Sequence, residues 1–121
     1  MKKIVIIDDD RLNLVLAQKI LEKKYEVSAF LSPLEAIAFL KRNSDSANLV
    51  LLDVLMPEMS GFEVMETLQQ DKDLKNIPVI FLTADDSEET KIKCEKSGAK
   101  GYVAKPFVAG RLLQIVSEIC A

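Results

Sequence analysis

The segment LVLLDVLMPEMSG, from Leu49 to Gly61, starts as a continuous apolar block and reaches an acid, Asp53, before turn-forming residues. Similar blocks, short and rich in β-branched residues, lie at Ile4 to Ile7 and Val79 to Leu82. Continuous apolar runs of this length are typical of parallel strands that are covered on both faces. We therefore predict three buried parallel strands at these places.

Two shorter blocks, Tyr25 to Phe30 and Gly101 to Val103, bring the number of predicted strands to five, and helical stretches separate them. A strict strand–helix repeat implies right-handed crossovers and an open parallel sheet of the α/β class. In the second helix Ser32 can cap, Pro33 suits the first turn and Glu35 can close a capping box. This helix is expected to end near Lys41.

Three of the helical stretches carry apolar residues that are expected to face the sheet. These are Leu12, Val15, Leu16 and Ile20 in the first helix, Val64, Met65 and Leu68 in the third, and Val108, Leu112, Ile115, Val116 and Ile119 in the fifth. The fourth helix, near Ser87 to Ser97, has only Ile92 and Cys94 as clearly apolar residues. We predict that it is weakly anchored and is the part of the molecule that moves.

Length and composition argue against several classes of function. The chain has 121 residues, a formal net charge of -3 and no histidine. The size suits one domain, residues 1–121, and the acidic balance argues against direct binding of nucleic acid or of anionic lipid. Without histidine the chain cannot form a Ser-His or Cys-His triad. Cys94 and Cys120 have no CxxC spacing, so we expect reduced thiols.

The beginning of the chain lacks the features of a secretory signal, and its apolar runs are too short to span a bilayer. A cytoplasmic location without membrane association is therefore expected.

Polar residues follow four of the predicted strands. Asp8, Asp9 and Asp10 end the first strand, Asp53 the third and Thr83 the fourth, and Lys105 follows the fifth. Open α/β sheets bind ligands at the carboxyl ends of their strands, where the strand order reverses. In the order 2-1-3-4-5 this point lies between strands one and three, the two strands that end in acids.

Each of these residues also has a structural interpretation. An aspartate after the first strand can cap a helix, Asp53 can be a turn residue, Thr83 a strand residue and Lys105 a solvated one. The combination is harder to explain that way, because clustered carboxylates repel each other unless a cation neutralises them. Hard oxygen ligands suit Mg²⁺, and beside such an ion a carboxylate can act as a nucleophile and form an aspartyl phosphate. A lysine and a threonine would bind the phosphoryl oxygens.

These residues resemble the receiver domain of two-component response regulators, in the style of the single-domain chemotaxis regulators, across essentially the whole chain. The resemblance is carried by four motifs in the expected order: Asp8-Asp9, Asp53-Val54-Leu55-Met56-Pro57 with Gly61, Thr83-Ala84, and Lys105-Pro106-Phe107. It implies the flavodoxin-like doubly wound (βα)5 fold with a five-stranded parallel sheet in the order 2-1-3-4-5. It also implies a signalling switch that catalyses only its own phosphorylation and dephosphorylation.

The resemblance assigns roles to individual residues. Asp53 is phosphorylated; Asp9, Asp53 and the Leu55 backbone carbonyl ligate Mg²⁺, with Asp8 acting mainly through bound water. Thr83 and Lys105 bind the phosphoryl group, and the Lys105-Pro106 bond is cis. Thr83 and Tyr102 form the switch, which alters the surface of the fourth helix, fifth strand and fifth helix.

The resemblance also implies the partners. A sensor histidine kinase or a histidine phosphotransfer protein supplies the phosphoryl group, and a downstream effector protein or domain reads the switched surface. The domain is expected to be a monomer, or a dimer formed through the fourth helix, fifth strand and fifth helix when phosphorylated. The small Ala84 should leave the phosphoryl group accessible, but Leu55 cannot orient a hydrolytic water, so we predict a fairly persistent phosphoryl state.

Two other functions are compatible with parts of the sequence. A haloacid-dehalogenase-like phosphatase would use Asp8 as nucleophile, and its DxDx[TV] motif is nearly met by residues 8–12, but position 12 is Leu12 and Asp53 would have no role. A flavodoxin-like carrier of FMN would need a loop that accepts a phosphate after the first strand. The loop here is acidic and lacks glycine, so it would repel that group.

Overall fold

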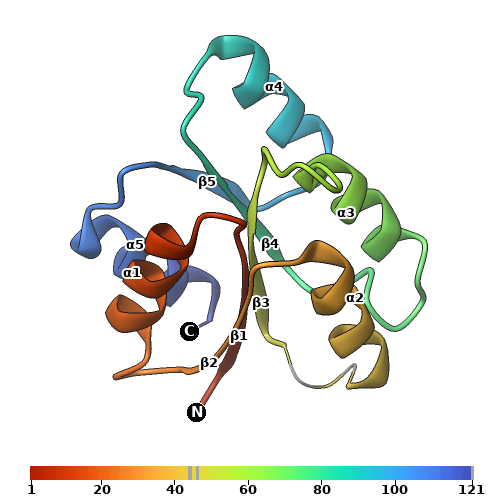
Figure 1. Ribbon diagram of the computed structural model, residues 1–121, viewed down its shortest axis with the longest axis horizontal. Helices are drawn as coiled ribbons and strands as arrows, with labels where there is room; N and C mark the ends of the chain where they lie inside the picture. Colours follow the sequence, from red (N-terminus) through yellow and green to blue (C-terminus); the bar gives the residue numbers. More distant parts are fainter. Residues whose placement is uncertain (44, 46, 121) are drawn as a thin grey trace.

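The structure is a computed structural model that describes residues 1–43, 45 and 47–120. Five strands alternate with five helices along the described part of the chain (Figure 1). Their order is β1 (Lys3–Ile7), α1 (Arg11–Leu21), β2 (Glu26–Phe30), α2 (Pro33–Arg42), β3 (Leu49–Asp53), α3 (Gly61–Gln69), β4 (Val79–Thr83), α4 (Glu88–Lys96), β5 (Gly101–Ala104) and α5 (Ala109–Ile119). The predicted alternation is confirmed.

The strands form one parallel sheet in the order β2-β1-β3-β4-β5, which confirms the predicted topology. The central strands β3 and β4 are buried along their whole length, as their continuous apolar blocks require. The strand order reverses between β1 and β3, and the register sets Ile7 beside Leu52 at this point. The acid-bearing ends of β1 and β3 are therefore neighbours.

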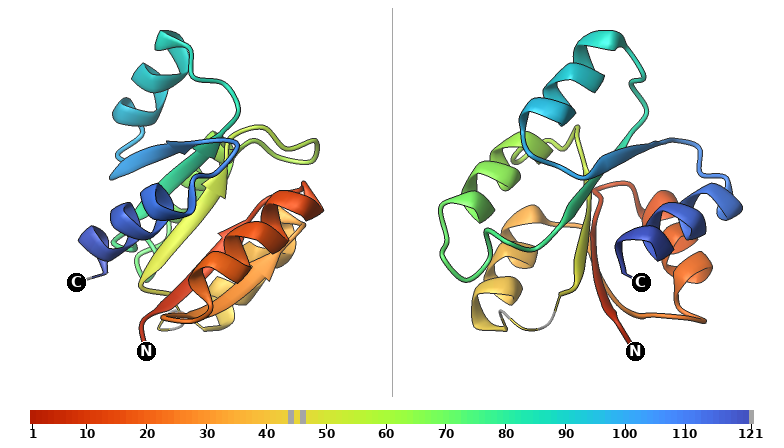
Figure 2. Two further views of the ribbon diagram at one scale, coloured as in Figure 1. Left: turned by 90° about the vertical axis from the view of Figure 1, so that its left-hand side faces the viewer. Right: turned by 180° about the vertical axis from the view of Figure 1, so that it is seen from behind.

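Helices cover both faces of the sheet (Figures 1 and 2). α1 and α5 lie together on one face, and α2, α3 and α4 follow the other. Alternate strand residues point to the two sides: Val5 and Ile7 belong to the cluster under α2 and α3, whereas Ile4 and Ile6 belong to the cluster under α1 and α5. None of the helices in the described part of the chain is both long and apolar enough to cross a membrane.

The buried face of α1 differs from the prediction. Leu12 is 83% exposed, and Val15 and Leu16 also lie at the surface, while Leu14, Ala17 and Leu21 are buried against the sheet. Of the four predicted residues, Ile20 alone packs against this core, and it is partly buried. The prediction failed because α1 is apolar on more than one side, so the helical period does not identify which side meets the sheet.

The other helices follow the sequence more closely. Val64, Met65 and Leu68 of α3 are buried as predicted, and so are Leu112, Ile115 and Val116 of α5. Ile119 is partly buried against the same core, whereas Val108 precedes α5 as its N-cap residue and is 68% exposed. In α4 the one buried residue is Cys94, and Ile92 is 42% exposed, so the predicted weak anchoring is present.

Side chains fix several helix starts. Ser32 accepts a hydrogen bond from the Glu35 amide at the start of α2, which is the first half of the predicted capping box. Both halves form at α3, where the Ser60 hydroxyl accepts from the Glu63 amide and the Glu63 carboxylate accepts from the Ser60 amide. These caps hold the chain where it leaves the carboxyl edge of the sheet.

Candidate functional site

The polar residues predicted to form a site lie at one edge of the sheet. Asp8 directly follows β1, Asp53 ends β3, Thr83 ends β4, and Lys105 directly follows β5. Asp8, Asp53 and Thr83 are all buried, with exposed fractions of 0%, 4% and 1%. Polar groups in such surroundings need partners, because burial without hydrogen bonds is unfavourable.

The Lys105 ammonium joins the two buried carboxylates. Its Nζ lies 2.7 Å from Asp8 Oδ2 and 3.1 Å from Asp53 Oδ1. The second oxygen of Asp8 accepts the backbone amide of Asp10 at 2.9 Å. Lys105 thus crosses from the end of β5 to the central acids, and the Lys105-Pro106 peptide bond is cis, as the resemblance implied.

Burial and the neighbouring acid make Asp53 reluctant to ionise. Desolvation and the charge of Asp8 raise the pKa of Asp53 to about 7, although Lys105 opposes this shift. For Lys105, burial alone would lower the pKa, but the hydrogen bond to Asp8 and the charges of both acids outweigh it and raise the pKa. The lysine is therefore charged, and the site holds an excess of carboxylates over cations.

Three acids could hold a metal ion at this edge. Asp8, Asp9 and Asp53 each offer a carboxylate oxygen, and these oxygens lie within 4.8 Å of one another. Asp9 is exposed, so the cluster opens to solvent on its side. Hard oxygens that are gathered beside a single ammonium fit a hard divalent cation such as Mg²⁺. Leu55, whose carbonyl was predicted as a ligand, lies just beyond β3 with its side chain 66% exposed.

Asp10 has a different role from Asp8 and Asp9. Its carboxylate accepts hydrogen bonds from the amides of Leu12 and Asn13 and so caps α1. The capping interpretation of the triple aspartate is thus fulfilled by Asp10, and Asp8 and Asp9 remain for the site.

Gly61 keeps the backbone of the acid-bearing strand in place. Its amide donates to the Val54 carbonyl at 2.8 Å, and a Cβ at this position would lie 2.3 Å from the backbone oxygen of Asp53. No side chain fits there without displacing the end of β3. The glycine of the motif is therefore a requirement of close approach next to Asp53.

Thr83 is hydrogen-bonded to Asp85, a residue for which the sequence predicted no role. Its hydroxyl accepts from the Asp85 amide at 2.9 Å and donates to the Asp85 carbonyl at 3.0 Å. The Asp85 carboxylate in turn accepts from the Ser87 amide and the Thr90 hydroxyl. An aspartate two residues before a helix-capping serine is the signal that could have identified this turn.

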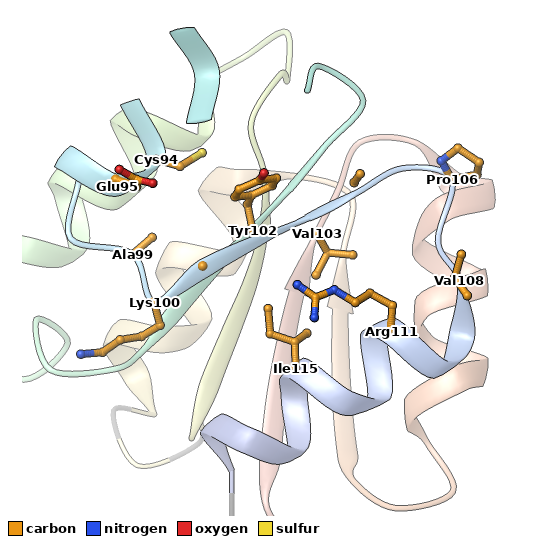
Figure 3. Close-up of a pocket in the computed structure, with 12 residues that line it drawn as sticks. Cys94, Glu95, Ala99, Lys100, Tyr102, Val103, Pro106, Val108, Arg111 and Ile115 are labelled. Atoms are coloured by element: carbon orange, nitrogen blue, oxygen red, sulfur yellow. The ribbon is translucent and has the colours of Figure 1, made fainter. Parts of the chain in front are cut away.

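Tyr102 lies on β5, the outermost strand of the sheet beside β4. It is half-buried, packs against the cluster under α2 and α3, and lines a groove of about 600 Å³ between α4 and α5. Figure 3 shows this groove with Tyr102 and Cys94 on one side of β5 and Arg111 and Ile115 on α5.

Comparison with known proteins gives the family. The family model described as the response regulator receiver domain matches residues 4–117. Among curated proteins, the polar-differentiation response regulator DivK of Brucella ovis is 31% identical over 118 residues, which cover 97% of this chain and 94% of that protein.

Solved structures agree with this result. The chemotaxis protein CheY4 of Vibrio cholerae superposes with a TM-score of 0.90 at 28% identity, with 98% of each chain covered. The BeF3-activated receiver domain of DrrB, from a Thermotoga maritima regulator, superposes with a TM-score of 0.86 at 31% identity, with 99% of this chain and 97% of that chain covered.

Proposed function

The chain belongs to the family of response regulator receiver domains, which act in two-component signalling, and we propose that it receives its phosphoryl group on Asp53. The observation that carries this proposal is the buried pair of Asp53 and Asp8 joined by Lys105 at the carboxyl end of the sheet. Residues 1–121 are taken as one receiver domain. It works as a switch that catalyses only its own phosphorylation and dephosphorylation.

The reaction uses the carboxylate of Asp53 as nucleophile. One of its oxygens attacks the phosphorus of the donor, an O–P bond forms, and the bond from phosphorus to the leaving group breaks with its electron pair. Lys105 stays charged throughout; its ammonium, which lies 3.1 Å from Asp53 Oδ1, would bind an oxygen of the phosphoryl group attached to Asp53. The Thr83 hydroxyl donates to a second phosphoryl oxygen.

Mg²⁺ is the cofactor that the donor set fits. Asp9, Asp53 and the Leu55 backbone carbonyl would hold the ion directly, and Asp8, which is bound to Lys105 and to the Asp10 amide, would act mainly through water. When bound, such an ion neutralises the carboxylates and draws charge from the phosphoryl oxygens. No other cofactor is proposed.

The output surface is the groove between α4 and α5. When Thr83 turns to the phosphoryl group, Tyr102 turns inward and the surface of α4, β5 and α5 changes. Arg111, Lys100 and Glu95 line the groove beside apolar residues, which gives a downstream effector both charge and apolar area to bind. The same surface would join two phosphorylated copies if the monomer dimerises.

The phosphoryl group comes from a sensor histidine kinase or a histidine phosphotransfer protein, since this chain has no histidine. Three apolar side chains near this edge of the sheet are exposed. Leu12 lies on α1, Leu55 follows β3, and Val108 lies between β5 and α5. Direct nucleic-acid or membrane binding is not proposed, and the location is cytoplasmic.

The phosphatase alternative finds little support. The chain matches the receiver family, and Asp8, the nucleophile that it would need, is fully buried with both oxygens engaged by Lys105 and the Asp10 amide. That function would also leave Asp53, which is joined to Lys105 in the same site, without a role.

The phosphoryl state is expected to persist. The small Ala84 leaves the phosphoryl group accessible, but Leu55 has no group that could orient a hydrolytic water. Replacement Leu55→Asn adds an amide at this exposed position and should speed dephosphorylation. Loss of ³²P from the purified phosphoprotein measures the rate. A slower loss in the variant would contradict this role of Leu55.

The proposal is tested by mass spectrometry after incubation with Mg²⁺ and acetyl phosphate. Wild type should gain one phosphoryl group, and Asp53→Asn should gain none under the same conditions. Omission of Mg²⁺, or its removal with a chelator, should abolish the gain in wild type. Equal gain by Asp53→Asn would overturn the proposal.

A further inference from the structure

The Thr83 hydroxyl is already in use in this structure. It has a single proton, which it donates to the Asp85 carbonyl at 3.0 Å, while it accepts the Asp85 amide at 2.9 Å. Donation to a phosphoryl oxygen needs the same proton. Thr83 can therefore bind a phosphoryl group only after it gives up its bond to the Asp85 carbonyl.

The side chain of Asp85 holds the first turn of α4. Oδ1 accepts the Ser87 amide at 2.9 Å, and Oδ2 accepts the Thr90 hydroxyl at 2.8 Å. Ser87 and Thr90 are also bound to each other, through the Thr90 amide and through their hydroxyls. The hydrogen bonds from Ser87 and Thr90 lower the pKa of Asp85, so its carboxylate is charged at neutral pH.

One residue thus contacts both the site and the helix. The backbone of Asp85 binds Thr83, and its carboxylate binds Ser87 and Thr90. We call these four residues the Asp85 clasp. Other anchoring of α4 is slight, because Cys94 is its one buried residue. The clasp therefore contributes a large share of what positions the start of this helix.

We propose that Asp85 is a positioning residue that keeps Thr83 and the start of α4 in the unphosphorylated arrangement. When Thr83 turns to a phosphoryl oxygen, the turn at Asp85 changes and the carboxylate releases α4. Phosphorylation is therefore less favourable by the free energy of the hydrogen bonds of the clasp that must break. This inference rests on the proposed function, since it concerns the same phosphoryl site.

Binding of beryllofluoride, a phosphoryl mimic, tests the clasp. Wild type and variants are titrated with beryllofluoride at saturating Mg²⁺, and the backbone NMR signals of Thr83 and α4 report binding. Asp85→Ala keeps the backbone bonds to Thr83 but removes those to α4, so it should bind about three- to tenfold more tightly, as expected for one or two exposed hydrogen bonds. Thr90→Val, which loses one of these bonds, should bind more tightly by a smaller factor.

Two controls separate the clasp from simple charge repulsion of the anionic ligand. Asp86→Ala removes the neighbouring exposed charge, and Asp86 has no hydrogen bond to another described residue. Asp85→Asn removes the charge at Asp85 itself but keeps an oxygen that accepts the Ser87 amide, and its NH2 group can donate to the Thr90 hydroxyl, which reverses the direction of that bond. The clasp predicts that both controls bind about as wild type does.

The outcomes are distinct. If Asp85→Ala binds no more tightly than wild type, or if both controls gain as much as Asp85→Ala, the clasp is contradicted while the proposed function stands. If wild type does not bind beryllofluoride with Mg²⁺ at all, the proposed function itself fails, and the clasp with it.

Discussion

Asp53 keeps its proton to an unusually high pH, and this has a consequence for stability. Its pKa is raised from 3.8 to about 7 in the folded protein, first by burial and then by the charge of Asp8. Between these two values the folded state binds a proton that the unfolded chain has lost. By linkage, the contribution of Asp53 to stability is present at low pH and is lost as pH rises toward about 7.

The substitution Asp53→Asn should remove this pH-dependent loss of stability, because the amide of asparagine does not ionise. Without metal, the variant should gain on the order of 4 kcal/mol in unfolding free energy relative to wild type between acid and neutral pH, because the pKa of Asp53 is raised from 3.8 to about 7. Urea unfolding at a series of pH values, with a chelator present, measures the difference. A difference that is independent of pH would contradict the raised pKa.

Mg²⁺ gives the control for this prediction. The ion competes with the proton for Asp53, so it should stabilise wild type more as pH rises through about 7 and should do little for Asp53→Asn.

Gly61 is a second residue with a defined physical role. A methyl group there would meet the Asp53 backbone oxygen at 2.3 Å, so Gly61→Ala must displace the end of β3. We expect a loss of about 1–3 kcal/mol in unfolding free energy together with slower phosphorylation by acetyl phosphate. Gly110→Ala is the matched control, because nothing lies within 4 Å of its added carbon. Equal stability of the two variants would contradict the close approach.

At the scale of elements, α3 and α4 form a natural comparison. Both have nine residues, but α3 buries four residues and α4 buries Cys94 alone. Local opening of α4 should therefore require less free energy, and its amides should exchange with deuterium at least about tenfold faster than those of α3. Hydrogen exchange followed by NMR measures both helices in one sample. Equal protection would show that α4 is not the mobile helix.

The elements also show what the sequence could and could not predict. Strand ends were predictable because continuous apolar blocks stop at the site acids, and Asp53 itself ends β3. The face of α1 was not predictable, because Leu12 and Leu14 are equally apolar and only the packing decides which is covered. The Asp85 clasp depends on side-chain hydrogen bonds within one loop, which residue types alone do not fix.

At the scale of the molecule, the sheet explains how distant residues act together. Asp8, Asp53 and Lys105 are far apart in sequence, yet parallel strands in the order 2-1-3-4-5 bring them to one edge. The same edge holds Thr83, whose turn leads to α4, while β5 carries Tyr102 to the groove with α5. A change at the acids can therefore reach the groove that we propose as the output surface through strands that already pair with one another.

The central claim is that Asp53 carries the phosphoryl group. After incubation with Mg²⁺ and acetyl phosphate, borohydride reduces an acyl phosphate to an alcohol, and peptide mass spectrometry then locates the altered side chain. We predict that Asp53 is converted to homoserine and that Asp8 and Asp9 are not. Conversion of Asp8 or Asp9 in its place, or of no aspartate at all, would contradict the account.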